Sequence, residues 1–362
     1  MKKGIIRAIF VKLMLNCISF FYHKNTFLTY IFIGDMMKKI MIILVGLLSC
    51  STRRLPSNSS YILMDINSKR VLYGSNIHER FLTASIAKCL TAYVAICEGD
   101  LSDEVKMSYE ASVEEGSKAY IPVGQIVTLE DLLYGLMLRS GNDCAYEIAY
   151  MIGGGVEGFS FLMNEYAKVI GMNNSTFENP SGLDSSSYNY STAYDMALLI
   201  SECYKNEIFM KIFGTKKYVK DNLVFYNKHK LVNMNDIYNG GKTGYTKKSG
   251  RTLITTAHNN LDLVCVTFND SNDWNTHKYY LSKGSLYKNT LIMEKGVLEN
   301  PFMKLDFLPY LKDDIYLPLL PNESYDIKIM INKNYHKDIG MVIVVIDDSS
   351  ISFKLERYYV DG

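Results

Sequence analysis

The sequence lacks the features by which several protein classes are recognised. Its 362 residues include one tryptophan and seven prolines, and the net charge is only +1, from 39 basic and 38 acidic residues. Such nearly equal numbers of basic and acidic residues argue against a dedicated nucleic-acid binder, whose affinity depends on clustered cations. The sequence contains no Gly-x-Ser-x-Gly motif, so the nucleophile turn of an α/β-hydrolase is not supported.

The cysteines also show no ordered spacing. There are seven of them, without a Cys-x-x-Cys pair or a Cys/His cluster, which predicts neither a disulfide framework nor a zinc site. Cysteines in apolar surroundings, such as Cys89 and Cys265, are expected to be small buried side chains. A length of 362 residues is enough for a large domain plus a small one, or for two domains of ordinary size. Hydrophobic residues make up 48% of the chain, so it can bury a core.

Residues 1–50 are expected to form a hydrophobic N-terminal extension and a signal or anchor. Lys38 and Lys39 precede an apolar run over residues 40–48 and then small residues at 49–51, which is the pattern of a secretory signal. A buried core helix is disfavoured because basic residues flank the apolar run. The remainder of the protein is therefore predicted to lie outside the cytoplasm, either secreted or anchored at its N-terminus.

The segment upstream of this signal has two interpretations. Residues 1 to about 35 form either a second hydrophobic anchor or an extension from a misplaced start codon. We favour the extension, because Met36 or Met37 begins a complete signal without it. Membrane association could also involve Cys50, since Leu-Leu-Ser-Cys faintly resembles a lipid-attachment site.

After a polar tether at 51–60, the patterns predict a main domain over residues 61–298 and a small β-rich domain over 301–362. A hairpin is expected around residues 67–69, and a capping-box-like start at Thr128 opens one of the helices. The other expected elements are helices at 85–97, 142–152, 191–203 and mostly over 274–298, and strands at 252–257, 263–268, 324–331, 341–347 and 351–359.

Three short motifs carry the chemistry. They are Ser85-x-x-Lys88 at a helix start, Ser140-x-Asn142 at a helix break and Lys-Thr-Gly at 242–244 beside a strand. The first two also occur elsewhere, at 285–288 and 187–189, so each motif alone has little specificity. Their conjunction in this order gives them weight, because the three together are typical of class A β-lactamases and penicillin-binding proteins.

The pair Ser85 and Lys88 fits nucleophilic catalysis. Residues three apart on a helix lie on one face, so the amine can reach the hydroxyl and take its proton. A free lysine has a pKa of about 10.4, whereas a base that works near neutrality needs about 7 to 8. Burial, the first helical turn and a second cation at Lys242 would each lower the pKa of Lys88. The alternative is an exposed helix lysine in a salt bridge.

Longer blocks around the motifs resemble the low-molecular-mass D-alanyl-D-alanine carboxypeptidases, serine peptidase family S11, over roughly residues 58–290. These blocks lie at 81–91, 132–143, 179–184, 191–197 and 241–246. The resemblance implies an α+β fold of the DD-peptidase/β-lactamase type, in which helices flank an antiparallel sheet. The active site would lie between the sheet and a helical subdomain, and a small all-β domain would follow at the C-terminus.

The resemblance also implies residue roles. Ser85 would be the nucleophile and Lys88 its base, while Ser140 would relay a proton to the leaving amine and Asn142 would hold the peptide carbonyl of the substrate. Without chemistry, Ser-Gly-Asn is simply a turn that ends a helix.

On the Lys-Thr-Gly strand, Lys242 and Thr243 would bind the terminal carboxylate of the substrate. Gly244 would let the strand backbone approach it closely. The backbone N–H groups of Ser85 and Tyr245 would form the oxyanion hole. The alternative for this motif is an ordinary start of a strand.

The expected function is removal of the terminal D-alanine from peptidoglycan stem pentapeptides through an acyl-enzyme on Ser85, with no metal or organic cofactor. β-Lactam antibiotics would be covalent inhibitors. Two alternatives are a serine β-lactamase on the same fold and a non-catalytic protein that binds penicillin or peptidoglycan. Glu178 is interpreted as part of a structural loop rather than as a deacylating carboxylate.

Overall fold

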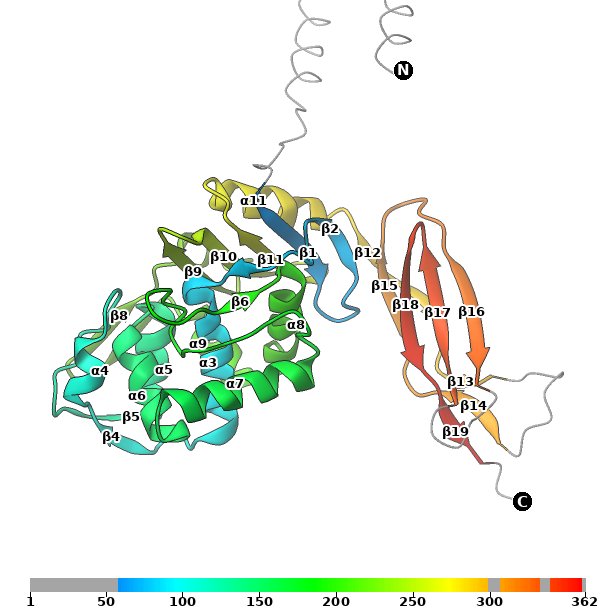
Figure 1. Ribbon diagram of the computed structural model, residues 1–362. Coiled ribbons are helices and arrows are strands. Elements are labelled where there is room, and N and C mark those ends of the chain that lie inside the picture. The colour runs from blue at the N-terminus through cyan, green and yellow to red at the C-terminus, as the bar shows by residue number, and fades with distance from the viewer. Residues whose placement is uncertain (1–57, 299–306, 333–338, 360–362) are drawn as a thin grey trace, which may run out of the picture. The chain divides into compact units, whose positions relative to one another are not determined.

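A computed structural model describes residues 58–298, 307–332 and 339–359 of the chain (Figure 1). The predicted signal, the Cys50 site and most of the tether lie outside these residues. The final tether residue, Ser60, is already the first residue of a strand.

The centre of the fold is a five-stranded antiparallel sheet in the order β2-β1-β11-β10-β9. Its strands are β1 (Ser60–Asp65), β2 (Val71–Ser75), β9 (Gly240–Thr246), β10 (Gly250–His258) and β11 (Asp262–Phe268). Consecutive residues of β11 are buried, and they alternate between two apolar clusters on the two sides of the sheet. The helix α11 (Asp273–Gly284) covers one face and α8 (Ala193–Cys203) the other (Figure 1).

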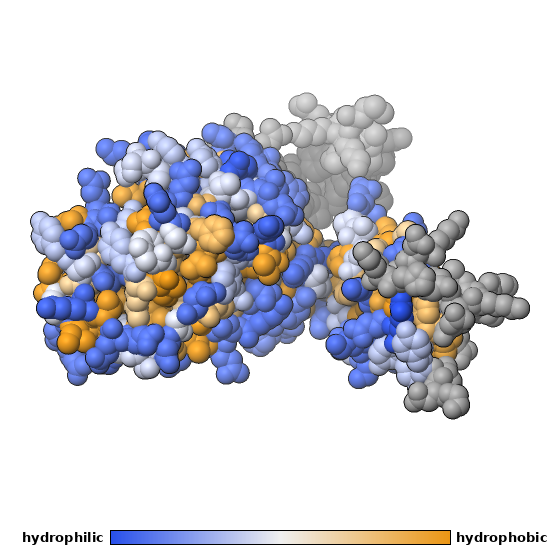
Figure 2. Space-filling view, turned by 60° about the horizontal axis from the view of Figure 1, so that its bottom comes forward, coloured by the Kyte–Doolittle hydropathy of each residue, from blue (hydrophilic) through white to orange (hydrophobic). Residues whose placement is uncertain are grey.

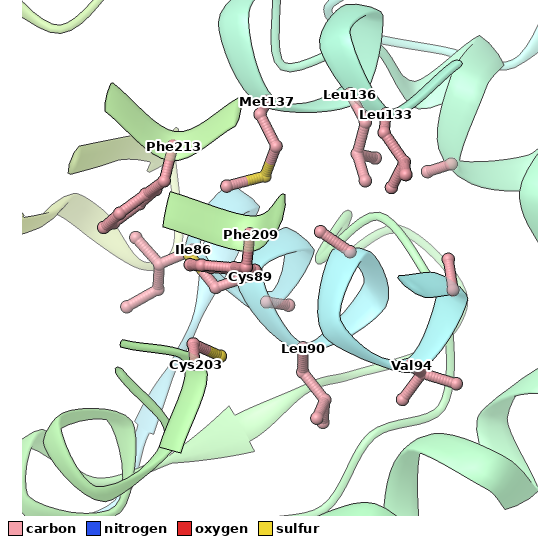
Figure 3. Packing of buried hydrophobic residues seen from close by; sticks show 14 of the residues in the cluster. Ile86, Cys89, Leu90, Val94, Leu133, Leu136, Met137, Cys203, Phe209 and Phe213 are labelled. Carbon is pink, nitrogen blue, oxygen red and sulfur yellow. The ribbon is translucent and has the colours of Figure 1, made fainter. Parts of the chain in front are cut away.

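Most helices gather on the α8 side of the sheet, around α3 (Lys88–Glu98). They are α4 (Tyr109–Val113), α5 (Leu129–Leu138), α6 (Asn142–Gly153), α7 (Val156–Ile170), α9 (Glu207–Gly214) and α10 (Lys230–Met234). Figure 3 shows Cys89, Leu90 and Val94 of α3 among side chains from α5 and α9, with Phe209 directly against the helix. Apolar contact around α3 therefore fixes the helix whose first residue is Lys88.

Short two-stranded pairs complete this part of the chain. They are β3 (Phe81–Leu82) with β6 (Tyr190–Ser191), β4 (Glu104–Lys106) with β5 (Ile126–Thr128), and β7 (Lys217–Lys220) with β8 (Leu223–Tyr226).

Beyond α11, the ordered elements among the described residues are all β-strands. The strands are β12 (Lys288–Met293), β13 (Gly296–Val297), β14 (Leu308–Leu311), β15 (Ile315–Leu319), β16 (Asp326–Ile331), β17 (Gly340–Ile346), β18 (Ser349–Lys354) and β19 (Glu356–Tyr358). They surround a separate apolar cluster that includes Leu317, Val342 and Val344. Strand pairing here begins at Lys288, because β12 pairs with β15.

Several expected elements are confirmed. The hairpin at 67–69 joins β1 to β2, and Thr128 and Asp131 form a reciprocal capping box at the start of α5. The helix expected over 274–298 is wrong in its second half. It ends at Gly284, where a side chain would come within 2.4 Å of Leu263, and the segment after it pairs as β12 instead.

Hydrophilic side chains cover much of the surface seen in Figure 2, with smaller hydrophobic groups between them. Within the part of the chain that the structure describes, no helix combines the length and the apolar character that a bilayer span requires.

The Asp131 carboxylate predicts a stability effect. It is 3% exposed and accepts hydrogen bonds from Thr128, Tyr218 and Lys220. Asp131→Ala removes one half of the capping box and leaves partly buried donors unpaired, so we expect a loss of roughly 1–3 kcal/mol in the free energy of unfolding. Denaturant titration measures it, with Glu130→Ala as the control, since Glu130 makes only a surface ion pair. Equal losses in both variants would contradict the assignment.

Candidate active site

The nucleophile candidate Ser85 lies in a 3₁₀ turn, Ala84–Ala87, immediately before α3. Two neighbours hold this turn: Thr83 N–H donates to the carbonyl of Asn189, and the Thr83 carbonyl accepts from the hydroxyl of Thr252 on β10. On the loop side the fit is close, since a Cβ on Gly182 would lie 1.8 Å from the carbonyl oxygen of Ala84. The Ser85 hydroxyl is therefore presented, partly exposed, from a fixed backbone.

Lys88 is fully buried below that hydroxyl. Its Nζ lies 3.1 Å from Ser85 Oγ and donates to Asn142 Oδ1 at 2.7 Å and to the carbonyl of Ser181. Burial, and then the charge of Lys242, hold the pKa of Lys88 well below its ordinary value. The alternative of an exposed, salt-bridged lysine is therefore wrong.

Ser140 and Asn142 occupy the break between α5 and α6. Ser140 has a left-handed backbone, with φ of 60°, a conformation that non-glycine residues adopt at a cost and often at functional sites. Asn142 is held by its backbone N–H, which donates to Ser117, and by its Nδ2, which donates to the carbonyl of Glu115. Its Oδ1 therefore points to Lys88.

Lys242 lies on β9 and is 1% exposed. Its Nζ donates to Ser140 Oγ at 2.7 Å and to the carbonyl of Thr243 at 2.9 Å. Burial lowers the pKa of Lys242 to about 7. Among the described residues, no carboxylate lies within ion-pair distance of Lys242 or of Lys88.

Gly244 allows β9 to approach the nucleophile turn. A Cβ there would lie 2.3 Å from the Thr252 hydroxyl oxygen and 2.9 Å from the backbone nitrogen of Ser85. The next residue, Tyr245, pairs with Arg251 of β10 and has a side chain that is 65% exposed. The strand backbone therefore runs past Ser85, as the three-motif pattern requires.

The structure thus brings the sequence candidates to one place. Lys88 contacts Ser85 and Asn142, Lys242 contacts Ser140, and the Lys242 charge acts on Lys88. Thr243, Gly244 and Tyr245 follow Lys242 along the same strand. The repeated motifs bring no side chain to the site: 285–287 lies between α11 and β12, and the side chains of Ser187 and Asn189 bond within their own loop.

Three other polar or thiol side chains of this region have structural roles. Glu178 is exposed and accepts from the backbone N–H of Tyr188, so it braces its loop. Asp143 is buried and accepts from the backbone N–H groups of Ala119 and Tyr120. Cys144 is a fully buried side chain.

Two contributions were missed from the sequence. The carbonyl of Ser181 accepts from Lys88, and the charge of the exposed Lys228 adds to the lowering of the pKa of both Lys88 and Lys242. A backbone carbonyl leaves no sequence signal. Lys228 lies in a segment without a recognised motif.

The chain is similar in sequence to curated proteins named D-alanyl-D-alanine carboxypeptidases. Over 223 residues it is 33% identical to D-alanyl-D-alanine carboxypeptidase DacF of Bacillus subtilis, a match that covers 59% of this chain and 57% of that protein. The chain thus spans little more than half the length of the curated relatives it matches.

Solved structures share the fold. Penicillin binding protein 5 of Haemophilus influenzae aligns with a TM-score of 0.72 at 24% identity, over 85% of this chain and 98% of that one. A D-alanyl-D-alanine carboxypeptidase of Mycobacterium tuberculosis aligns with a TM-score of 0.61 at 25% identity, over 74% and 98% of the two chains.

The expected α+β fold with an antiparallel sheet and a helical subdomain is thereby confirmed. A family model for D-alanyl-D-alanine carboxypeptidases matches residues 52–272, more than half of the chain and all three motifs. The chain belongs to the D-alanyl-D-alanine carboxypeptidase family, serine peptidase family S11.

Proposed function

We propose that this protein is a serine-type D-Ala-D-Ala carboxypeptidase that removes the terminal D-alanine from peptidoglycan stem pentapeptides. The observation that carries the proposal is the buried Lys88 amine, 3.1 Å from the Ser85 hydroxyl oxygen and without a carboxylate partner among the described residues. Family membership supports the same reaction.

Burial lowers the pKa of Lys88 well below its ordinary value and so favours the neutral amine. Such an amine has two N–H donors and one lone pair, whereas an ammonium has three donors and none. Asn142 Oδ1 and the Ser181 carbonyl take the two donors. The lone pair is left for the hydroxyl proton of Ser85, so Lys88 is placed to act as a general base.

In the proposed reaction Ser85 Oγ attacks the carbonyl carbon between the two D-alanines and its proton passes to Lys88. The backbone N–H groups of Ser85 and Tyr245 stabilise the oxyanion. The peptide C–N bond then breaks, and Ser140 delivers a proton to the leaving amine. Water hydrolyses the ester on Ser85 and restores the enzyme.

The remaining candidates bind the substrate. Lys242 and Thr243 hold the terminal carboxylate, Asn142 holds the peptide carbonyl, and Gly244 permits the close approach of the strand. An entering carboxylate favours the charged form of Lys242, whose pKa of about 7 makes protonation readily accessible.

A β-lactam would acylate Ser85 by the same attack and remain bound. The β-lactamase alternative needs efficient deacylation, and Glu178, the carboxylate considered for it, is exposed and bonded to Tyr188. The alternative of a non-catalytic binding protein leaves a buried base beside a hydroxyl without a purpose.

The remaining parts of the proposal concern organisation and location. The predicted catalytic domain over 61–298 and small C-terminal β-domain over 301–362 are retained with their boundary moved to about residue 288, because β12 pairs with β15 and Ile292 belongs to the apolar cluster of the tail. The protein acts outside the cytoplasm, secreted or anchored through residues 1–50, as the signal-like pattern and the peptidoglycan substrate suggest.

Ser85→Ala should abolish both the release of D-alanine from a pentapeptide and covalent labelling by penicillin, with a rate loss of at least about a thousandfold. Mass spectrometry of penicillin-treated wild-type protein should find a long-lived adduct on the Ser85 peptide. Continuous penicillin turnover would support the β-lactamase instead. Unchanged D-alanine release by the variant would remove Ser85 from the mechanism.

Lys242→Met should change the pH dependence of stability. A lysine whose folded-state pKa is lowered from 10.5 to about 7 destabilises the wild type at pH 7, because the unfolded chain binds a proton that the folded chain does not. That penalty fades towards pH 10.5. Relative to wild type, the variant should therefore lose up to roughly 4 kcal/mol of unfolding free energy between pH 7 and 10.

Denaturant unfolding at several pH values measures this difference. Lys247→Met is the control, because it makes the same substitution at an exposed lysine just beyond Tyr245 and Thr246. A stability difference for Lys242→Met that is constant over the same range would show that the Lys242 amine is not protonated on unfolding.

A further inference from the structure

Two buried histidines, His229 and His277, lie behind the active-site strand and belong to none of the three motifs. Thr255 of β10 connects them: its hydroxyl lies 3.1 Å from His229 Nε2 and 2.7 Å from His277 Nδ1. The last member of this row of side chains is Thr267 of β11, whose hydroxyl oxygen lies 3.1 Å from His277 Nε2. Burial lowers the pKa of His229 to about 3 and that of His277 well below its ordinary value, so both rings are neutral.

The hydrogen bonds settle the tautomer of His229. Its Nδ1 accepts from the backbone N–H of Val232, and through this bond His229 caps the N-terminus of α10. The proton of the neutral ring is therefore on Nε2, which donates to the carbonyl of Ile254 at 3.0 Å. His229 thus joins the start of α10 to the central sheet.

His229 contacts the sheet at the position of Lys242. Ile254 is the β10 residue directly opposite Lys242 in the β9–β10 ladder. The imidazole also lies against the residue before Lys242, since a Cβ on Gly241 would be 2.3 Å from His229 Nε2. The ring of Trp274, 5.0 Å away between centroids, packs against the imidazole at 77°.

The same segment contacts the other side of the site. The backbone N–H of Lys228 donates to the carbonyl of Leu138, two residues before Ser140, and Asn227 Oδ1 accepts from the backbone N–H of His229. Residues 227–229 therefore link the end of α5, which carries Ser140, to the strand that carries Lys242.

We propose that His229 is a positioning residue that holds the Lys242 amine on Ser140, and so sets recognition of the substrate's terminal carboxylate. The inference rests on the proposed function. On this proposal the neutral imidazole does more than cap α10. Its Nε2–H donates to Ile254 on β10, and its ring lies against Gly241 on β9, so both contacts are with the strands beside Lys242.

His229→Asn separates the two tasks. Asparagine at this position can still cap α10 through Oδ1, but it is too short to reach the Ile254 carbonyl or to fill the space beside Gly241. His277→Asn is the matched control: it makes the same change to an equally buried ring of the same network, whose hydrogen bonds go to Thr255 on β10 and Thr267 on β11.

The experiment compares release of D-alanine from a peptide that ends in D-Ala-D-Ala with turnover of the same peptide carrying a terminal amide. Rates are divided by the fraction of protein that penicillin acylates, so partial unfolding does not enter. For His229→Asn the preference for the free carboxylate should fall by roughly tenfold or more, the effect of a small misplacement of a binding group. His277→Asn should keep the wild-type preference, and His229→Gln, which can still donate to Ile254, should lie between.

The failures are distinguishable. A wild type that neither releases D-alanine nor is acylated would overturn the proposed function. An active wild type whose carboxylate preference survives in His229→Asn, or is lost equally in His277→Asn, would overturn the positioning role alone.

Discussion

The site depends on keeping two amines buried with no carboxylate of the described residues within ion-pair distance of either. An ammonium in such a place would normally be paired, because burying an unpaired charge costs several kcal/mol. Here hydroxyl, amide and carbonyl oxygens contact Lys88 and Lys242 instead, and burial keeps the pKa values of both amines low. A single carboxylate in contact with Lys88 would favour the ammonium and remove the base.

Bringing these amines to the nucleophile turn requires close backbone approach from two sides. Gly244 brings β9 to the Ser85 nitrogen, and Gly182 brings the loop after Pro180 against Ala84. Left-handed backbone at Ala84 and Ser140 aims the two turns. Conformations of this kind persist only where the surrounding structure determines them, and here the packing of α3 and the central sheet does so.

Much of this arrangement could be predicted from the sequence. The helix starts, the hairpin of β1 and β2 and the three motifs follow local patterns, because a cap, a turn or a helical spacing leaves its mark within a few residues. The motifs also resembled those of a known family. The tertiary contacts could not be predicted: the Ser181 carbonyl, the charge of Lys228 and the strand after Gly284 depend on segments far apart in the chain.

His229 illustrates the same limit more sharply. In the sequence it is a single histidine between two lysines, and nothing local distinguishes a buried ring from an exposed one. Its neutrality is essential to its place, because a protonated imidazole would set a buried positive charge beside Lys242. Since Nδ1 is occupied by Val232 N–H and the ring is buried, the fold itself excludes that proton. The layer behind the active-site strand thus supports it without adding charge to it, which a lysine or arginine there could not do.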